Sequence, residues 1–227
     1  MKFNHIISLG NDCFVRSFMT KTGAMKTKAD GQMSCPFDLM QINNINDLYK
    51  IISSDFSFFF TDLQVCDGMP CSKSMNFVHE VTNHCIFNEV VADANNHNTG
   101  GNSLDFITND FELLKERYSQ RIKNYFNKLQ DDNILFIYHS EQGQQYPWQL
   151  LDVLSNKYPK LNFKLMYINT CTSNTKVPEI PYDDNNQYSQ YNILNYLNKH
   201  WAYSEWFIIP QVIHILHQVF GENIPKF

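Results

Sequence analysis

Residues 5–16 read HIISLGNDCFVR, and this stretch decides how the rest of the chain is interpreted. Its first half is a short apolar run of β-forming residues, which Gly10 ends. Apolar side chains then recur at helical spacing over residues 14–19. The sequence therefore predicts a strand, a tight turn and a helix, with Asn11 or Asp12 as the helix N-cap.

Cys13 falls at the start of the predicted helix. Backbone N–H groups in a first helical turn have no helical partner and the helix dipole is positive there, so a thiolate is favoured. A cysteine between the first strand and the first helix is therefore well placed to act as a nucleophile. The alternative is a small buried residue that fills this corner, because free cysteine is among the most buried residue types.

The composition is that of a folded globular protein. The chain has 227 residues, of which 43% are hydrophobic and 15% aromatic. A net charge of -5 makes nucleic acid and anionic membrane surfaces poor candidates as partners. The N-terminus has no signal-peptide pattern, and no apolar run approaches the ~20 residues that a spanning helix needs. These features predict a cytoplasmic protein that does not bind membranes.

The cysteines give no metal-binding pattern. Six of them are spread along the chain without CxxC pairs, and their spacing fits no usual zinc site. They are Cys13, Cys35, Cys66, Cys71, Cys85 and Cys171. We therefore expect no metal and no other cofactor, and we expect reduced thiols.

Strands and helices alternate in the second half of the chain. The predicted strands are residues 133–138 and 163–168, and the predicted helices are residues 109–129, 148–158, 191–197 and 209–220. Asn109 and Glu112 have the spacing of a capping pair for the long helix. The alternation predicts an α/β fold: a single domain over residues 1–227, with a mostly parallel central sheet flanked by helices and an irregular insertion at about residues 60–105.

Such a sheet also predicts where a site would lie. Ligands of parallel sheets bind beyond the carboxyl ends of the strands. Cys13, His139 and Asn169 each come at the end of a predicted strand. We therefore expect these three residues to share one edge of the sheet.

Three short motifs resemble a known family in their order and spacing. They are SLGNDC at residues 8–13, CPFD at residues 35–38 and NFVHEV at residues 76–81. Over roughly residues 5–138 the chain is similar to a group of uncharacterised proteins described as papain-like cysteine peptidases. That group carries SLGxxC, PFDW and F-x-H-[DE]-F, so Leu39 and Val81 depart from its pattern.

The resemblance implies a Cys–His nucleophilic site. Cys13 would attack an acyl carbon, His79 would take and return the proton, and Asp38 would orient the imidazole. Backbone groups of the turn would bind the oxyanion or the substrate, at Gly10, Asn11 and Asp12. The implied function is a thiol-dependent acyl-transfer enzyme, either a cysteine peptidase-like or an esterase-like hydrolase.

Other assignments of these residues stay open. His84 competes with His79 for the position of the motif histidine, and His139 could serve as the base instead. His79 could also be an ordinary half-buried strand residue. Asp38 could simply cap the helix that follows it, because aspartate is a favoured capping residue.

The opening of the chain also resembles two other groups of enzymes. It is similar to the GDS block of SGNH-type esterases, with Cys13 in place of serine, and to capsule acetyltransferases with a GNC opening. The alternatives are therefore an acetyltransferase acting on a carbohydrate and a non-catalytic binding or interaction module. The expected partner is a small-molecule, peptide or glycan substrate, and the sequence predicts no oligomeric state.

Overall fold

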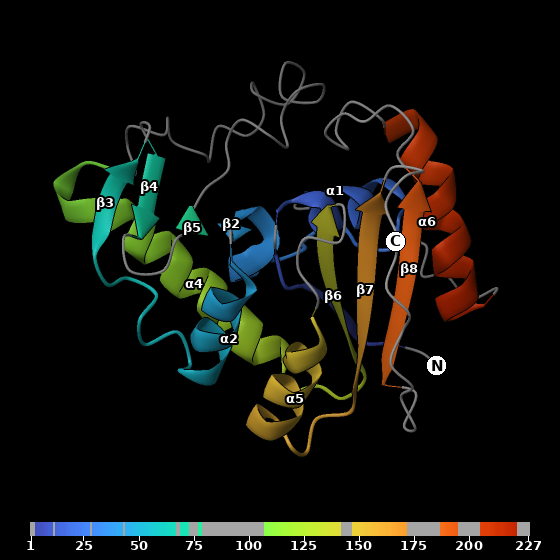
Figure 1. Ribbon diagram of the computed structural model, residues 1–227. Coiled ribbons are helices and arrows are strands. Elements are labelled where there is room, and N and C mark those ends of the chain that lie inside the picture. Colours follow the sequence, from blue (N-terminus) through green and yellow to red (C-terminus); the bar gives the residue numbers. More distant parts are fainter. Residues whose placement is uncertain are drawn as a thin grey trace.

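The computed structural model is organised around a four-stranded parallel sheet (Figure 1). It describes residues 3–10, 12–27, 29–42, 44–66, 69–72, 77–78, 107–141, 147–171, 187–194 and 205–221. The strands are β1 (His5–Ser8), β6 (Ile134–Glu141), β7 (Phe163–Cys171) and β8 (Tyr188–Leu194), in the order β1-β6-β7-β8. All neighbouring pairs are parallel, which confirms the predicted α/β fold with a parallel central sheet.

The central strands are buried on both faces. Residues 134–140 of β6 are all buried, and β7 is buried except at Lys164. Such continuous burial is expected of parallel strands that helices cover on both sides. In the ladder, Ile134 pairs with both His5 and Phe163, so the three strands predicted near residues 4–9, 133–138 and 163–168 are neighbours.

Helices cover both faces of the sheet and give the molecule three layers (Figure 1). On one face lie α1 (Phe14–Lys21) and α6 (Glu205–Phe220), and on the other lie α2 (Ile45–Ser53), α4 (Glu112–Lys128) and α5 (Trp148–Lys157). Phe14 of α1 and Val212 of α6 belong to a core that includes Ile137 of β6. A separate core on the other face surrounds Phe136. No helix among the described residues is long and apolar enough to cross a membrane.

A second, antiparallel sheet contains the first part of the insertion that was predicted at about residues 60–105. Its strands are β2 (Gln41–Ile42), β5 (Phe77–Val78), β4 (Met69–Ser72) and β3 (Leu63–Cys66), in the order β2-β5-β4-β3. The β3–β4 hairpin brings the Cα atoms of Cys66 and Cys71 to 5.9 Å, and the two cysteines form a disulfide. The expectation of reduced thiols is wrong for this pair, because the hairpin aligns two cysteines that no sequence motif connects.

Two local predictions are also wrong. Residues 188–194 form a strand, although a helix was predicted from residue 191. The apolar residues of this segment fit either a helix or a strand, and tyrosine and isoleucine favour a strand. Pairing with β7 then stabilises the strand. Asn109 and Glu112 form no capping pair. Residues 109–111 make a 3₁₀ turn with left-handed φ angles, and Glu112 is already the first residue of α4.

Candidate active site

The candidate site lies at the carboxyl edge of the parallel sheet, where the turn after β1 meets the end of β6. The backbone N–H of His139 donates to the carbonyl of Gly10 at 3.4 Å, so the two segments are in contact. Cys13, His139 and Asn169 therefore lie at one edge, as predicted. His139 and Asn169 project from opposite faces, because His139 pairs with Ile168 and side chains alternate along a strand.

Gly10 gives the turn its shape and brings it against a second motif. Its φ of +85° lies in the left-handed region, which favours glycine. A β-carbon at this position would lie 3.1 Å from Ile42 Cδ1 and 4.0 Å from Phe37 Cβ. The turn that leads to Cys13 therefore passes directly beside the segment that carries the CPFD motif.

Cys13 lies between this turn and α1. The N-cap of α1 is Cys13 and not Asn11 or Asp12 as predicted, and no side chain among the described residues caps it. Asp12 supports the helix start from one residue earlier, since its Oδ1 accepts the backbone N–H of Phe14 at 2.9 Å. The Cys13 carbonyl accepts the N–H of Ser17 at 3.0 Å, the first bond of the helix. The Cys13 side chain is fully buried, and its sulfur is in a disulfide whose other half lies outside the described residues. Such a sulfur must be reduced before it can act as a nucleophile.

His139 is fully buried behind the turn and is bonded on both sides of its ring. Its Nδ1 lies 3.0 Å from Asp12 Oδ1, and its Nε2 lies 3.1 Å from Thr170 Oγ1. The ring stacks on Phe14, with centroids 3.9 Å apart and planes at 9°. The sequence placed His139 at this edge but did not reveal its link to Asp12, because 127 residues separate them. Thr170 was missed, and its only signal was its place at a strand end.

Asp38 is buried in a 3₁₀ turn, η1 (Pro36–Leu39). Its Oδ2 accepts the backbone N–H of Cys35 at 2.8 Å, so Asp38 caps its own turn rather than the helix that follows. Its Oδ1 is buried and has no hydrogen-bond partner among the described residues. A buried carboxylate oxygen is rarely left unpaired, because removing it from water is unfavourable, so this oxygen is suited to accept a donor from another group.

Cys35 is not an activated thiol. Burial raises the pKa of the Cys35 thiol to about 12, and the negative charge of Asp38 adds to the rise. Lys128 and Arg16 lie close enough to oppose this rise, but burial has the larger effect on the pKa. The neutral thiol is therefore the stable form of Cys35 at neutral pH.

In the folded protein, Cys35 is expected to resist iodoacetamide at about pH 8, because only the thiolate reacts and an ordinary cysteine has a pKa near ~8.5. Unfolding in guanidinium should remove the burial and make Cys35 react like an ordinary cysteine. Mass-spectrometric peptide mapping of both states measures the difference. Equal alkylation rates in the folded and unfolded states would contradict the assignment.

The pairing of β2 with β5 brings two motifs side by side. Gln41 of β2, three residues after Asp38, lies opposite Val78, the last residue of β5. The strand after the CPFD motif therefore runs beside the strand that leads to the motif histidine. His79, His84 and Asn11 themselves lie outside the described residues.

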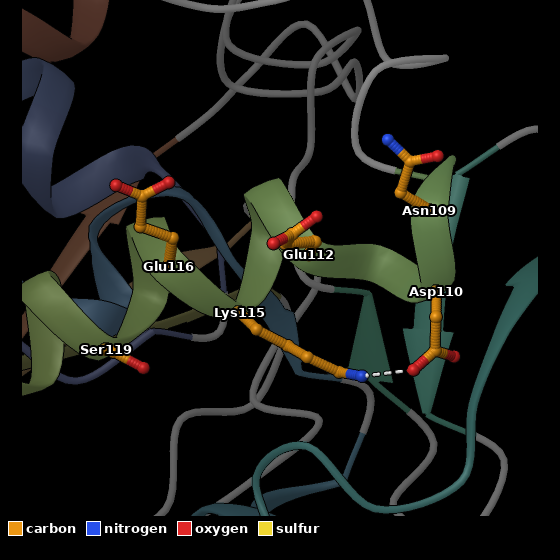
Figure 2. A pocket seen from close by; sticks show the side chains of 6 residues that line it. All are labelled: Asn109, Asp110, Glu112, Lys115, Glu116 and Ser119. Carbon is orange, nitrogen blue, oxygen red and sulfur yellow. Dashed lines mark hydrogen bonds and ion pairs between the residues drawn. The ribbon is translucent and has the colours of Figure 1, made fainter.

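An open hollow of about 430 Å³ lies at the start of α4 (Figure 2). Six polar or charged side chains line it: Asn109, Asp110, Glu112, Lys115, Glu116 and Ser119. Lys115 Nζ forms an ion pair with Asp110 Oδ2 at 2.8 Å. None of the six is a cysteine or histidine, so this hollow is separate from the candidate nucleophile. In the described part of the chain, no group of three or more His, Cys, Asp or Glu residues could hold a metal ion.

The geometry can be compared with known proteins. Residues 4–173 match the family described as "Putative papain-like cysteine peptidase (DUF1796)", and this range includes the Cys13 turn, η1, β5 and β6. No curated protein and no solved structure gives a significant match. The match covers well over half of the chain and all three motifs on which the resemblance was based. The chain therefore belongs to the DUF1796 family, whose description is "Putative papain-like cysteine peptidase".

Proposed function

We propose that this protein is a cysteine-dependent hydrolase that transfers an acyl group through Cys13, with His79 as the base and Asp38 as the residue that orients it. The observation that carries the proposal is the buried Oδ1 of Asp38, which lacks a hydrogen-bond partner among the described residues. An imidazole N–H is a suitable donor for such an oxygen. Asp38 is thereby prepared to hold a catalytic histidine in one orientation.

The strand pairing supports His79 as that histidine. Val78, the residue before His79, lies opposite Gln41 in the segment that follows Asp38. The same segment touches the Cys13 turn, because Ile42 packs against Gly10. Three motifs that are far apart in the sequence are thus carried by neighbouring backbone segments. His84 and His139 have no comparable support, since both ring nitrogens of His139 are already engaged.

In the proposed reaction, His79 takes the proton of the Cys13 thiol, and the thiolate attacks the acyl carbon of the substrate. The new S–C bond forms an acyl-enzyme as the leaving group departs with the proton from His79. Water then cleaves the thioester and restores the thiol. The Phe14 N–H already donates to Asp12, and the Gly10 N–H donates to Ser8 Oγ at 3.4 Å. The proposed oxyanion donors are therefore the backbone N–H groups of Asn11 and Asp12.

A second candidate function is a non-catalytic binding module on the same scaffold. The complete burial of Cys13 and its disulfide favour this alternative, because a nucleophile must reach its substrate. The two functions differ in what reduction does. A hydrolase becomes active when Cys13 is reduced, whereas a binding module gains no activity.

The test is hydrolysis of fluorogenic peptides and esters by the reduced protein. Cys13→Ala is expected to lower kcat/KM by about 1,000-fold or more, because it removes the nucleophile. Asp38→Asn is expected to lower kcat/KM by about 10- to 100-fold, because it weakens the orientation of the base. Cys171→Ala is the matched control, since Cys171 is a buried cysteine outside the proposed machinery, and it should retain activity. Hydrolysis that survives Cys13→Ala would overturn the proposal. Transfer of acetyl to a sugar instead of water would indicate the acetyltransferase.

A further inference from the structure

His139 holds the residues on both sides of Cys13. It hydrogen-bonds to Asp12, which precedes Cys13, and its ring stacks on Phe14, which follows it. His139 and Phe14 are fully buried, and the Asp12 side chain is only 13% exposed. The backbone of Cys13 is therefore held at two adjacent points by one side chain from β6.

One carboxylate oxygen of Asp12 contacts both the start of α1 and the His139 ring. Asp12 Oδ1 accepts the backbone N–H of Phe14 at 2.9 Å and faces His139 Nδ1 at 3.0 Å. Because a carboxylate only accepts hydrogen bonds, the network assigns the proton to Nδ1 of His139. Moving Asp12 would therefore release the first turn of α1 as well as the bond to β6.

Thr170 completes the support from the neighbouring strand. Its Oγ1 lies 3.1 Å from His139 Nε2, and its side chain is buried at the end of β7. With Nδ1 protonated, the Thr170 hydroxyl can donate to Nε2, which fixes the orientation of the ring. Both ring nitrogens are thus engaged, and neither is available to take a proton from Cys13.

We propose that His139, supported by Thr170, is a positioning residue that sets the geometry of Cys13 through Asp12 and Phe14. This inference rests on the proposed function of Cys13 as the nucleophile. It assigns His139 a role different from that of a base: it holds the helix start in place so that the thiolate and the turn N–H groups face one reacting carbon.

Two conservative substitutions of His139 distinguish the role of Nδ1 from the role of Nε2. In His139→Asn the amide nitrogen replaces Nδ1 and can still donate to Asp12, whereas in His139→Gln it replaces Nε2 and leaves Asp12 without that donor. In the reduced protein, the alkylation rate of Cys13 by iodoacetamide should stay within about threefold of wild type for His139→Asn. It should fall about tenfold or more for His139→Gln, as expected for one lost charge-assisted hydrogen bond.

A second experiment tests whether His139 acts on Cys13 through Asp12, and it uses an Asp12→Ala variant. If His139 acts through Asp12, His139→Gln should add no further loss to an Asp12→Ala variant, because coupled residues are not additive. Equal rates for His139→Asn and His139→Gln, or fully additive losses, would overturn the inference.

NMR of the imidazole provides a readout that does not depend on Cys13. A proton on Nδ1 of His139 should be observed in the wild type and should exchange faster in Asp12→Ala. A wild-type His139 without a proton on Nδ1 would refute the positioning role even if Cys13 is reactive. An unreactive Cys13 with this proton present would instead count against the proposed hydrolase.

Discussion

Reduction with dithiothreitol is expected to raise the rate at which iodoacetamide alkylates Cys13 by at least about 100-fold, because a sulfur in a disulfide is not a nucleophile. The structure places the Cys13 sulfur in a disulfide and Cys35 in a buried, neutral thiol form. The gain on reduction should therefore appear at Cys13 and not at Cys35. Site-resolved mass spectrometry of the protein before and after reduction measures both residues.

The control for this prediction uses the second disulfide. Cys66 and Cys71 are also bonded to each other, so the reductant opens that hairpin as well. A Cys66→Ser, Cys71→Ser variant lacks this bond, and Cys13 should still gain reactivity on reduction. If the gain disappears in the double variant, the hairpin rather than Cys13 is the redox-sensitive element. Fast alkylation of Cys13 without reductant would contradict the prediction directly.

Gly10→Ala is expected to destabilise the fold by about 2–4 kcal/mol, because left-handed backbone is unfavourable for alanine and the new β-carbon crowds its neighbour. Gly10 has a φ of +85°, and the β-carbon would lie 3.1 Å from Ile42 Cδ1. Urea unfolding of the variant and the wild type measures the loss in the free energy of unfolding. The same substitution should displace the Cys13 turn, so the alkylation rate of reduced Cys13 should also fall.

Gly23→Ala is the matched control for this substitution. Gly23 has a φ of +75°, but a β-carbon there would meet no atom within 4 Å. Its expected loss is therefore only the backbone part, about 1–2 kcal/mol. Ile42→Val removes the crowding methyl group and should restore part of the stability of Gly10→Ala. Equal losses for Gly10→Ala and Gly23→Ala would show that the contact with Ile42 is unimportant.

The main sheet could be predicted because its strands are long and buried. The run that became β6 is continuously apolar before its polar end, and the run that became β7 is apolar apart from Lys164 before it reaches Asn169 and Thr170, which is typical of parallel strands. β8 could not be assigned in the same way, since it mixes tyrosine with polar residues and its partner β7 decides its conformation. Of the small antiparallel sheet, only the strand at residues 76–81 was predicted, and β5 lies within it. The other three strands have only two to four residues, too few to show a period of their own.

Some features of the candidate site could likewise be predicted from the sequence, and others could not. The place of Cys13 followed from local order, because a strand, a glycine and a helix fix where the intervening turn must lie. The contact of Asp12 with His139 could not be read from the sequence, since it exists only when β1 and β6 are neighbours in the sheet. The disulfide state of Cys13 was unpredictable for the same reason: no local pattern connects this residue to another cysteine.

The most direct test of the central claim, that Cys13 is an activated nucleophile, is to rank the cysteines of the fully reduced protein by their alkylation rates. Iodoacetamide at about pH 6 reacts slowly with ordinary thiols, whose pKa is near ~8.5, so only an activated thiolate is modified quickly. Reduced Cys66 is the internal reference for an ordinary thiol, because its side chain is only partly buried. Burial raises the pKa of the Cys171 thiol, so Cys171 should react more slowly than Cys66. The account predicts that Cys13 is alkylated at least about tenfold faster than Cys66 and that His79→Ala abolishes the difference. Alkylation of Cys13 no faster than that of Cys66 would contradict it.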